Sequence, residues 1–248
     1  MLVDKLKDII DKSNNIVFFG GAGISTESGI PDFRSGNGLY NIVEERKYSP
    51  EEMLSSSFFY SHTKDFYDFY REKMIYQNAK PNAAHIALAK LEKMGKLKAV
   101  ITQNIDGLHQ AAGSKNVLEL HGSVHRNYCI NCNTFQELDF VMKFKDVPKC
   151  PHCGGIIKPD VVLYGEGLHP DIISETVNII ANAEVLIIGG TSLVVYPAAA
   201  LIRYYEGNNL ILINKSSTQY DNNANLVIND SIGKVMSEIM TFYSKEND

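Results

Sequence analysis

The sequence predicts an α/β protein in which helices cover both faces of a parallel β-sheet. Along the 248 residues, short apolar runs alternate with segments of helical periodicity, as in a series of βαβ units. The first apolar run, residues 16–19, leads directly into the glycine-rich turn 20–23. Four cysteines in two close pairs lie within residues 123–157 and indicate a small subdomain inserted into this fold.

Each element is indicated by its own local pattern. The helix over 82–94, for example, has Asn82 at its start and Gly95 at its end, residue types that begin and stop helices. The expected helices cover residues 2–12, two or more short pieces of 50–77, residues 82–94 and 171–182, and a segment that begins at Pro197. The expected strands, each a short apolar run, cover residues 16–19, 99–102, 117–120, 185–188, 210–213 and 226–228.

Composition excludes several classes of protein. Hydrophobic residues make up 44% of the chain and charged residues 21%, which is ordinary for a folded domain with its own core. A net charge of −5 argues against a dedicated nucleic-acid binder and favours basic partners such as lysine-rich peptide segments. No apolar run approaches the roughly 18 residues of a membrane span, and the N-terminus does not resemble a signal peptide. A cytoplasmic location is therefore expected.

The cysteines follow the spacing of a structural metal site. Cys129 and Cys132 form one C-x-x-C pair, Cys150 and Cys153 another, and 17 residues separate the two pairs, as in a zinc ribbon. Four thiolates would complete a tetrahedral site for one structural Zn²⁺ and leave no position for substrate. Two disulfides are the alternative, which a reducing cytosol disfavours.

Residues 20–23 form the kind of turn that binds a nucleotide, although a pattern this short also occurs in plain turns. Gly21 and Gly23 leave backbone N–H groups accessible to a pyrophosphate. Thr26 replaces the third glycine of the dinucleotide-binding pattern, and residues 28–31 break the helix that a dehydrogenase has there. The turn therefore predicts a Rossmann-like core that uses NAD for a reaction other than hydride transfer.

Five expected strands end in small or polar residues. Because ligands of parallel sheets bind beyond the carboxyl ends of the strands, these strand ends predict one shared crevice. The five strand ends are residues 20–23, 103–106, 121–122, 189–192 and 214–216.

Residues 20–34 resemble the first signature of the sirtuins, the NAD-dependent protein lysine deacylases. Further segments resemble later signatures in the family's order: residues 102–109, 121–122, the four cysteines, 158–166, and 190–193 with 197–198. The resemblance covers residues 15–232 and implies a compact catalytic core of bacterial or archaeal type. By this resemblance, residues 1–248 would be a single catalytic domain. Its Rossmann-like core would cover about 1–40, 80–122 and 158–248, with a helical insertion of about 41–79 and a zinc-binding insertion of about 123–157.

The resemblance implies a reaction and its catalytic residues. Acetyl groups would leave protein lysine side chains with NAD as co-substrate, giving free lysine, nicotinamide and O-acetyl-ADP-ribose. His121 would take the proton of a ribose hydroxyl, and Asn104 would order the ribose and a water molecule. Gln103 would lie at the ribose, while Asp106 and the backbone of Ile105 would hold the nicotinamide carboxamide.

The resemblance also assigns residues that bind the two substrates. The remaining cofactor contacts would come from Ala22, Thr26, Phe33, Arg34, Thr191, Ser192, Asn214 and Ser231. Residues 161–166 and 193–196 look like two strands that hold the acetyl-lysine peptide between them. Its contacts would come from Val162, Gly165, Glu166 and Val194.

One departure from the family concerns the acyl group. Sirtuins that prefer acidic acyl groups carry a Tyr-x-x-Arg pair, and here Tyr67 is followed by Tyr70 at the arginine position, with Arg71 one residue late. This favours acetyl and other uncharged acyl groups. Two alternatives stay open, a protein ADP-ribosyltransferase and an NAD- and zinc-binding module without catalysis. Acetyl-lysine proteins are the expected partners of a monomer that binds neither nucleic acid nor membranes.

Overall fold

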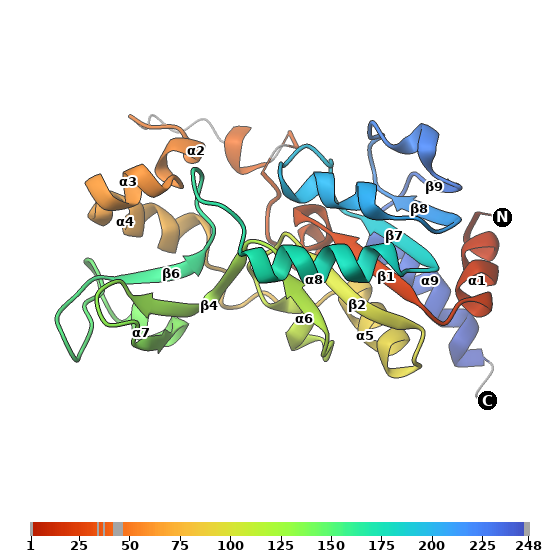
Figure 1. The fold of residues 1–248 in the computed structure, drawn as a ribbon, viewed down its shortest axis with the longest axis horizontal. Helices are drawn as coiled ribbons and strands as arrows, with labels where there is room; N and C mark the ends of the chain where they lie inside the picture. The colour runs from red at the N-terminus through yellow and green to blue at the C-terminus, as the bar shows by residue number, and fades with distance from the viewer. Residues whose placement is uncertain (1, 34, 37, 42–46, 246–248) are drawn as a thin grey trace.

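The main sheet places its first strand at the centre. The computed structural model describes residues 2–33, 35–36, 38–41 and 47–245, and within them six parallel strands run in the order β3-β2-β1-β7-β8-β9 (Figure 1). The strands are β1 (Ile16–Gly20), β2 (Leu97–Thr102), β3 (Val117–Glu119), β7 (Val185–Gly189), β8 (Asn209–Ile213) and β9 (Leu226–Ile228). The chain extends the sheet on one side of β1 and then on the other, so the loops after β1 and β7 flank the point where the strand order reverses, the usual place for a ligand.

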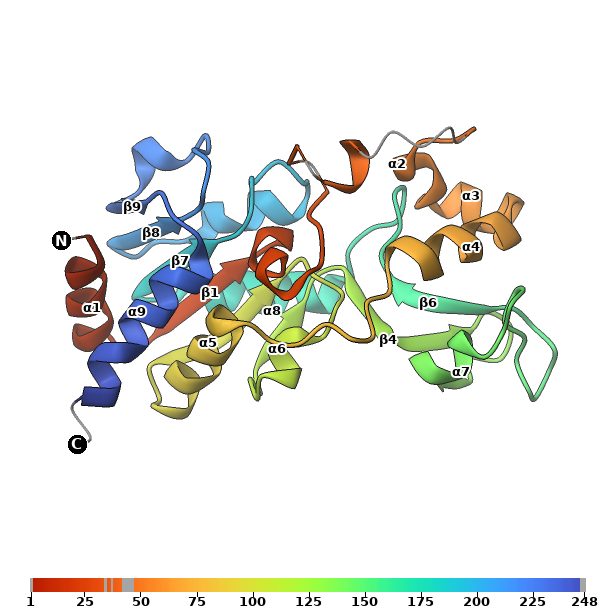
Figure 2. The same cartoon turned by 180° about the vertical axis from the view of Figure 1, so that it is seen from behind.

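Helices cover both faces of this sheet, so the expected α/β class is confirmed. On one face α1 (Leu2–Lys12), α5 (Ala83–Lys93) and α9 (Ile232–Lys245) pack over inward side chains such as Phe18 (Figure 2). On the other face α8 (Pro170–Ala181) and a 3₁₀ helix (Ala198–Tyr204) pack over alternate strand residues such as Phe19. Because consecutive strand residues point to opposite faces, burial on both faces makes β1 apolar throughout.

A second, smaller body contains β4 (Gly122–Cys129), which begins shortly after β3 in the chain. An antiparallel sheet in the order β5-β4-β6 forms its centre, with β5 (Phe135–Glu137) and β6 (Ile157–Val161). Helix α7 (Leu138–Met142) and the helices α2 (Pro50–Met53), α3 (Ser56–Ser61) and α4 (Thr63–Lys73) share one apolar core with this sheet (Figure 1). Two segments far apart in the sequence thus form one body. The short helix α6 (Leu108–Ala111) follows β2.

Three local expectations need correction. The helix expected at Pro197 is a 3₁₀ helix, and α9 is a full helix that the sequence reading did not anticipate. Residues 161–166 and 193–196 were expected to form two strands outside the main sheet. Residues 161–166 leave β6 after Val161 and turn back, with Glu166 N–H donating to Leu163 O. Residues 193–196 form no strand because Leu193 adopts a φ of 56°, which interrupts an extended backbone. Within the described ranges, no helix is both long and apolar enough to cross a membrane.

Candidate functional site

A groove of about 950 Å³ runs across the carboxyl ends of the main-sheet strands. All five predicted strand ends contribute to its lining, including the turn after β1 and His121 beyond β3. Residues 103–106, which follow β2 and are called the β2 loop below, also line it. The topology brings these segments together because parallel strands end at the same edge of the sheet.

The turn after β1 is held against the loop after β7. The N–H of Gly23 donates to Gly190 O at 2.8 Å, and a side chain at Gly23 would place its Cβ 2.7 Å from the same oxygen. Only glycine allows this approach. Two 3₁₀ turns, Ala22–Ile24 and Thr26–Ser28, follow in place of a helix, so the backbone of the turn borders the groove directly.

Ser25 joins the two polar side chains of the β2 loop. Its hydroxyl donates to Asp106 Oδ2 at 2.7 Å and accepts from Asn104 Nδ2 at 3.0 Å. The other Asp106 oxygen, Oδ1, accepts from Leu108 N–H at 2.9 Å. Ser25 is only 1% exposed, and the sequence reading gave it no role. The signal that could have found it is a hydroxyl residue just after the glycine-rich turn.

The imidazole of His121 is fixed in one tautomer. Its Nδ1 lies 3.0 Å from the backbone oxygen of Gln103, and a carbonyl can only accept, so Nδ1 carries the hydrogen. Burial lowers the pKa of His121, and the bond to Gln103 offsets this only in part. The ring is therefore neutral near pH 7, and its Nε2 lone pair can accept a proton.

The part of the groove formed by the loops after β7 and β8 has a donor available for a ligand. Asn214 Oδ1 accepts from Thr191 N–H at 3.0 Å, and the Thr191 hydroxyl lies 3.2 Å from Gln103 Nε2. Asn214 Nδ2 is buried and has no hydrogen-bond partner among the described residues. Since burying an unpaired donor costs roughly 1–3 kcal/mol, this amide fits a site whose ligand supplies an acceptor.

The structure places the other predicted cofactor residues as follows. Ala22, Thr26, Phe33, Ile105, Ser192 and Ser231 all line the groove. The Thr26 hydroxyl donates to Gly23 O at 2.9 Å, and Ser231 N–H donates to Asp230 Oδ1 at 2.8 Å, so both are partly used within the chain. Arg34 lies outside the described residues.

The predicted peptide contacts divide into two groups. Val162, Gly165 and Glu166 line the groove, whereas Val194 is 49% exposed and lies outside its described lining. The Glu166 carboxylate accepts from Leu163 N–H at 2.9 Å and pairs with Lys158 at 3.2 Å, so it orders its own loop. Val162 N–H donates to His121 O at 3.0 Å, which connects this loop to the histidine.

The two tyrosines of α4, Tyr67 and Tyr70, are both buried. The Tyr67 hydroxyl donates to Ile157 O, while the Tyr70 hydroxyl has no partner among the described residues although Tyr70 borders the groove. Arg71 is directed elsewhere: it bonds Asp146 O, lies 3.8 Å from Asp68 and packs over the Tyr67 ring. It is not among the described residues that line the groove.

The four cysteines form one cluster at the end of the small body. Their sulfur atoms all lie within 4.8 Å of one another, with contacts of 3.4–3.5 Å between the two pairs. A disulfide bond needs about 2.05 Å, so the geometry excludes the alternative of two disulfides. Four thiols at tetrahedral spacing are the donor set that structural Zn²⁺ prefers.

Several known proteins are similar to this chain in sequence and in fold. The model of the Sir2 family matches residues 21–197. The NAD-dependent protein deacetylase of Clostridium tetani is 66% identical over 236 residues, covering 95% of this chain and 96% of that protein. Its counterpart in Clostridium acetobutylicum is 64% identical over 239 residues, 96% and 98% of the two chains. A solved structure of Sir2 with a p53 peptide and NAD⁺ superposes with a TM-score of 0.86 at 39% identity, over 99% and 100% of the chains. A Sir2 variant with deacetylated p53 peptide and 3′-O-acetyl-ADP-ribose gives 0.88 at 41% identity, over 98% of each.

Proposed function

Because this chain belongs to the Sir2 family, we propose that it removes acetyl groups from protein lysine side chains with NAD as co-substrate. The products are free lysine, nicotinamide and O-acetyl-ADP-ribose. The observation that carries the proposal is the placement of His121 in the groove, with its Nδ1 bonded to the β2 loop, which leaves Nε2 to act as a base.

The groove offers groups for each part of the dinucleotide. Bound NAD supplies the nicotinamide leaving group and the ribose hydroxyls that accept the acetyl group. The turn after β1 presents its backbone to the phosphates, and Thr191, Ser192 and the unpaired Asn214 amide serve the adenosine half. Asp106, held by Ser25, and the backbone of Ile105 bind the nicotinamide carboxamide.

Catalysis depends on proton transfer and orientation. Asn104, fixed through Ser25, orders the ribose and a water molecule, and Gln103 lies beside it. His121 Nε2 removes the proton from the ribose hydroxyl that takes up the acetyl group. The Gln103 carbonyl accepts from Nδ1–H throughout and so stabilises the imidazolium that forms.

The acetylated peptide binds as an extended strand between residues 161–166 and 193–196. Main-chain pairing there makes few demands on peptide sequence. Val162, Gly165, Glu166 and Val194 are its proposed contacts, with Val162 facing the acyl-lysine amide and Glu166 acting by ordering the loop.

One Zn²⁺ held by Cys129, Cys132, Cys150 and Cys153 has a structural role in this proposal. These cysteines join the end of β4 to the segment before β6, so the metal stabilises the sheet that begins beside His121. We further propose a cytoplasmic monomer, and the compartment is supported by four cysteines that form no disulfide, as a reducing environment requires.

The test is a product assay on the purified protein. Nicotinamide should form only when NAD and an acetyl-lysine peptide are both present, with an equal amount of O-acetyl-ADP-ribose. The unacetylated peptide is the control and should give neither product. Transfer of ADP-ribose to protein without acetylated peptide would favour the transferase alternative, and NADH formation would refute both.

A further inference from the structure

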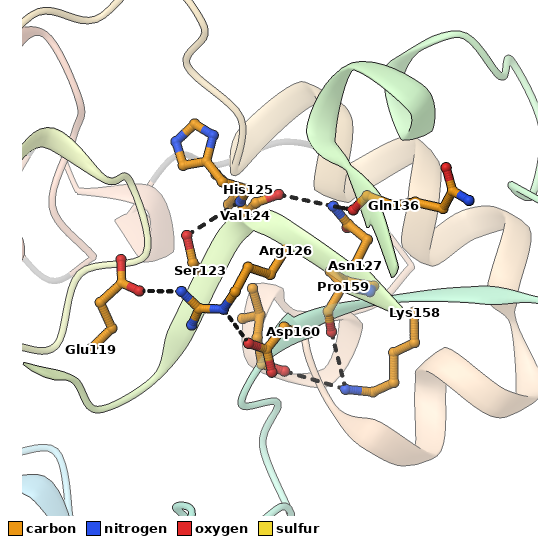
Figure 3. Close-up of polar contacts among 11 residues, drawn as sticks. Glu119, Ser123, Val124, His125, Arg126, Asn127, Gln136, Lys158, Pro159 and Asp160 are labelled. Carbon is orange, nitrogen blue, oxygen red and sulfur yellow. Dashed lines mark hydrogen bonds and ion pairs between the residues drawn. The ribbon is translucent and has the colours of Figure 1, made fainter. Parts of the chain in front are cut away.

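Strand β4 contains a bulge next to His121. Gly122 and Ser123 pair with Val161 and Asp160 of β6, and the next pair is Asn127 with Pro159, so residues 124–126 have no partner on β6. On its other edge β4 pairs with β5 from Arg126 onward. The buried Asn127 amide supports the bulge, since its Nδ2 donates to Val124 O at 3.2 Å and to Gln136 O at 3.4 Å (Figure 3).

The bulge connects β4 to the β2 loop. Val124 N–H donates to Ile105 O at 3.0 Å, and His125 Nε2 lies 3.1 Å from Asp106 O. Both acceptors belong to the part of the loop proposed to bind the nicotinamide carboxamide. The shape of the bulge therefore determines where this loop lies relative to the small sheet.

Arg126 leaves the bulge in the opposite direction from His125 and bonds two carboxylates (Figure 3). Its Nη1 donates to Glu119 Oε2 at 2.6 Å, and its Nε donates to Asp160 Oδ2 at 2.7 Å. Glu119 ends β3 of the main sheet and is 6% exposed, while Asp160 belongs to β6 of the small sheet. One guanidinium thus joins the two sheets. Burial alone would lower the pKa of Arg126, but the bonds to both carboxylates outweigh this effect and raise the pKa above its ordinary value, so the group stays charged.

These bonds close a ring around His121. Glu119 lies two residues before His121, and Asp160 lies two residues before Val162, whose N–H donates to His121 O at 3.0 Å. The backbone has little freedom here: Gly122 has a φ of 76°, and a Cβ on it would lie 1.9 Å from Asp160 O. Any shift of β3 against β6 therefore moves His121 or breaks the bond to Val162.

We propose that Arg126 is a positioning residue for the deacetylation reaction: by holding Glu119 and Asp160 together it fixes the bulge of β4, and with it the placement of His121 relative to the β2 loop. The proposal rests on the proposed function, although Arg126 itself lies outside the described lining of the groove. An arginine suits this role because its planar fork bonds both carboxylates at once, whereas a lysine ammonium reaches one at a time.

The experiment compares Arg126→Ala and Arg126→Lys with the wild type in kcat, in KM for NAD and for an acetyl-lysine peptide, and in amide hydrogen exchange without substrates. Lys64→Met is the matched control, since it removes an exposed ion pair with Asp68 on α4, away from the groove. We expect Arg126→Ala to lower kcat about tenfold or more, because misplacement of reacting groups by about 1 Å costs up to 10²-fold. The amides of Val124 and Val162 should exchange faster, Arg126→Lys should fall between, and Lys64→Met should match the wild type.

Two results would overturn the proposal. One is an Arg126→Ala protein with wild-type kcat and wild-type exchange at Val124 and Val162. The other is faster exchange throughout the main sheet together with lower stability, which would indicate a general structural role. If Arg126→Ala does not fold, the proposal is refuted by an Arg126→Lys protein whose kcat and hydrogen exchange equal those of the wild type. Hydrogen exchange needs no catalysis, so an inactive wild type would reject the proposed function while this comparison still tests the positioning role.

Discussion

Acid should destabilise this protein through two buried histidines. His85 on α5 and His109 on α6 lie inside the protein with ring centroids 4.7 Å apart. Both nitrogens of His109 and Nε2 of His85 have no partner among the described residues. Burial lowers the pKa of His85 to about 4, although the charges of Asp106 and Glu27 raise it in part. Burial, helped by the neighbouring His85, lowers the pKa of His109 to about 3.

The sign of the effect follows from proton binding. Below the ordinary pKa of 6.5, the two histidines bind protons in the unfolded chain but stay neutral in the folded protein. The free energy of unfolding therefore falls as the pH decreases. Above about pH 7 the two histidines contribute no pH dependence. At pH 5 the pH is about 1.5 units below the ordinary pKa of 6.5. At about 1.4 kcal/mol per unit, each buried ring then lowers the free energy of unfolding by about 2 kcal/mol, or by about 4 kcal/mol for both. Typical domains have only about 5–15 kcal/mol in total.

The assay is urea unfolding of the wild type and of His109→Leu at pH 7.5 and pH 5. His109→Leu removes one buried titrating ring at similar volume, so its stability should fall about 2 kcal/mol less between the two pH values. At pH 7.5 the variant should equal or exceed the wild type, because the nitrogens it loses have no described partners. Zinc release in acid affects both proteins, so the difference between them measures His109.

His169→Asn is the matched control, since His169 is exposed and Asn keeps its capping role at the start of α8. It should show the pH dependence of the wild type. Equal loss of stability in His109→Leu and wild type would refute the reasoning, because it would mean that His109 accepts a proton in the folded state.

Three further predictions concern the site. His121→Ala should keep NAD binding, measured by calorimetry, but lose roughly 10²-fold or more in kcat, and near-normal turnover would remove His121 from the mechanism. About one equivalent of zinc should copurify, and Cys150→Ala should lower both metal content and thermal stability; a stable, fully active metal-free protein would contradict the structural role. Acetyl-lysine should exceed succinyl-lysine in kcat/KM by about 10- to 100-fold, which is what an arginine–carboxylate pair would contribute to binding of the succinyl group. No such pair can form here, because Tyr70 is neutral and Arg71 is bound at Asp146. A succinyl preference on the same peptide would show that Arg71 reaches the acyl group.

Features that depend on local pattern could be predicted from the sequence alone. The apolar runs of the main sheet predicted its strands, and parallel strands must end at one edge, so the meeting of residues 20–23, 103–106 and His121 followed without coordinates. The spacing of the cysteines likewise predicted their cluster. The periodicity of α9 is local too, so the sequence could also have predicted this helix, which the expected elements did not include.

Only the tertiary structure decided how the site is held. Ser25 bonds Asn104 and Asp106 from 79 and 81 residues away, and Arg126 joins carboxylates on two different sheets. The tautomer of His121 depends on a carbonyl 18 residues distant. Periodicity reports which face of an element is buried, but not which side chains from other elements meet it. Such pairings are set by strand order, by the bulge in β4 and by the packing of the two bodies, so they exist only once the chain has folded.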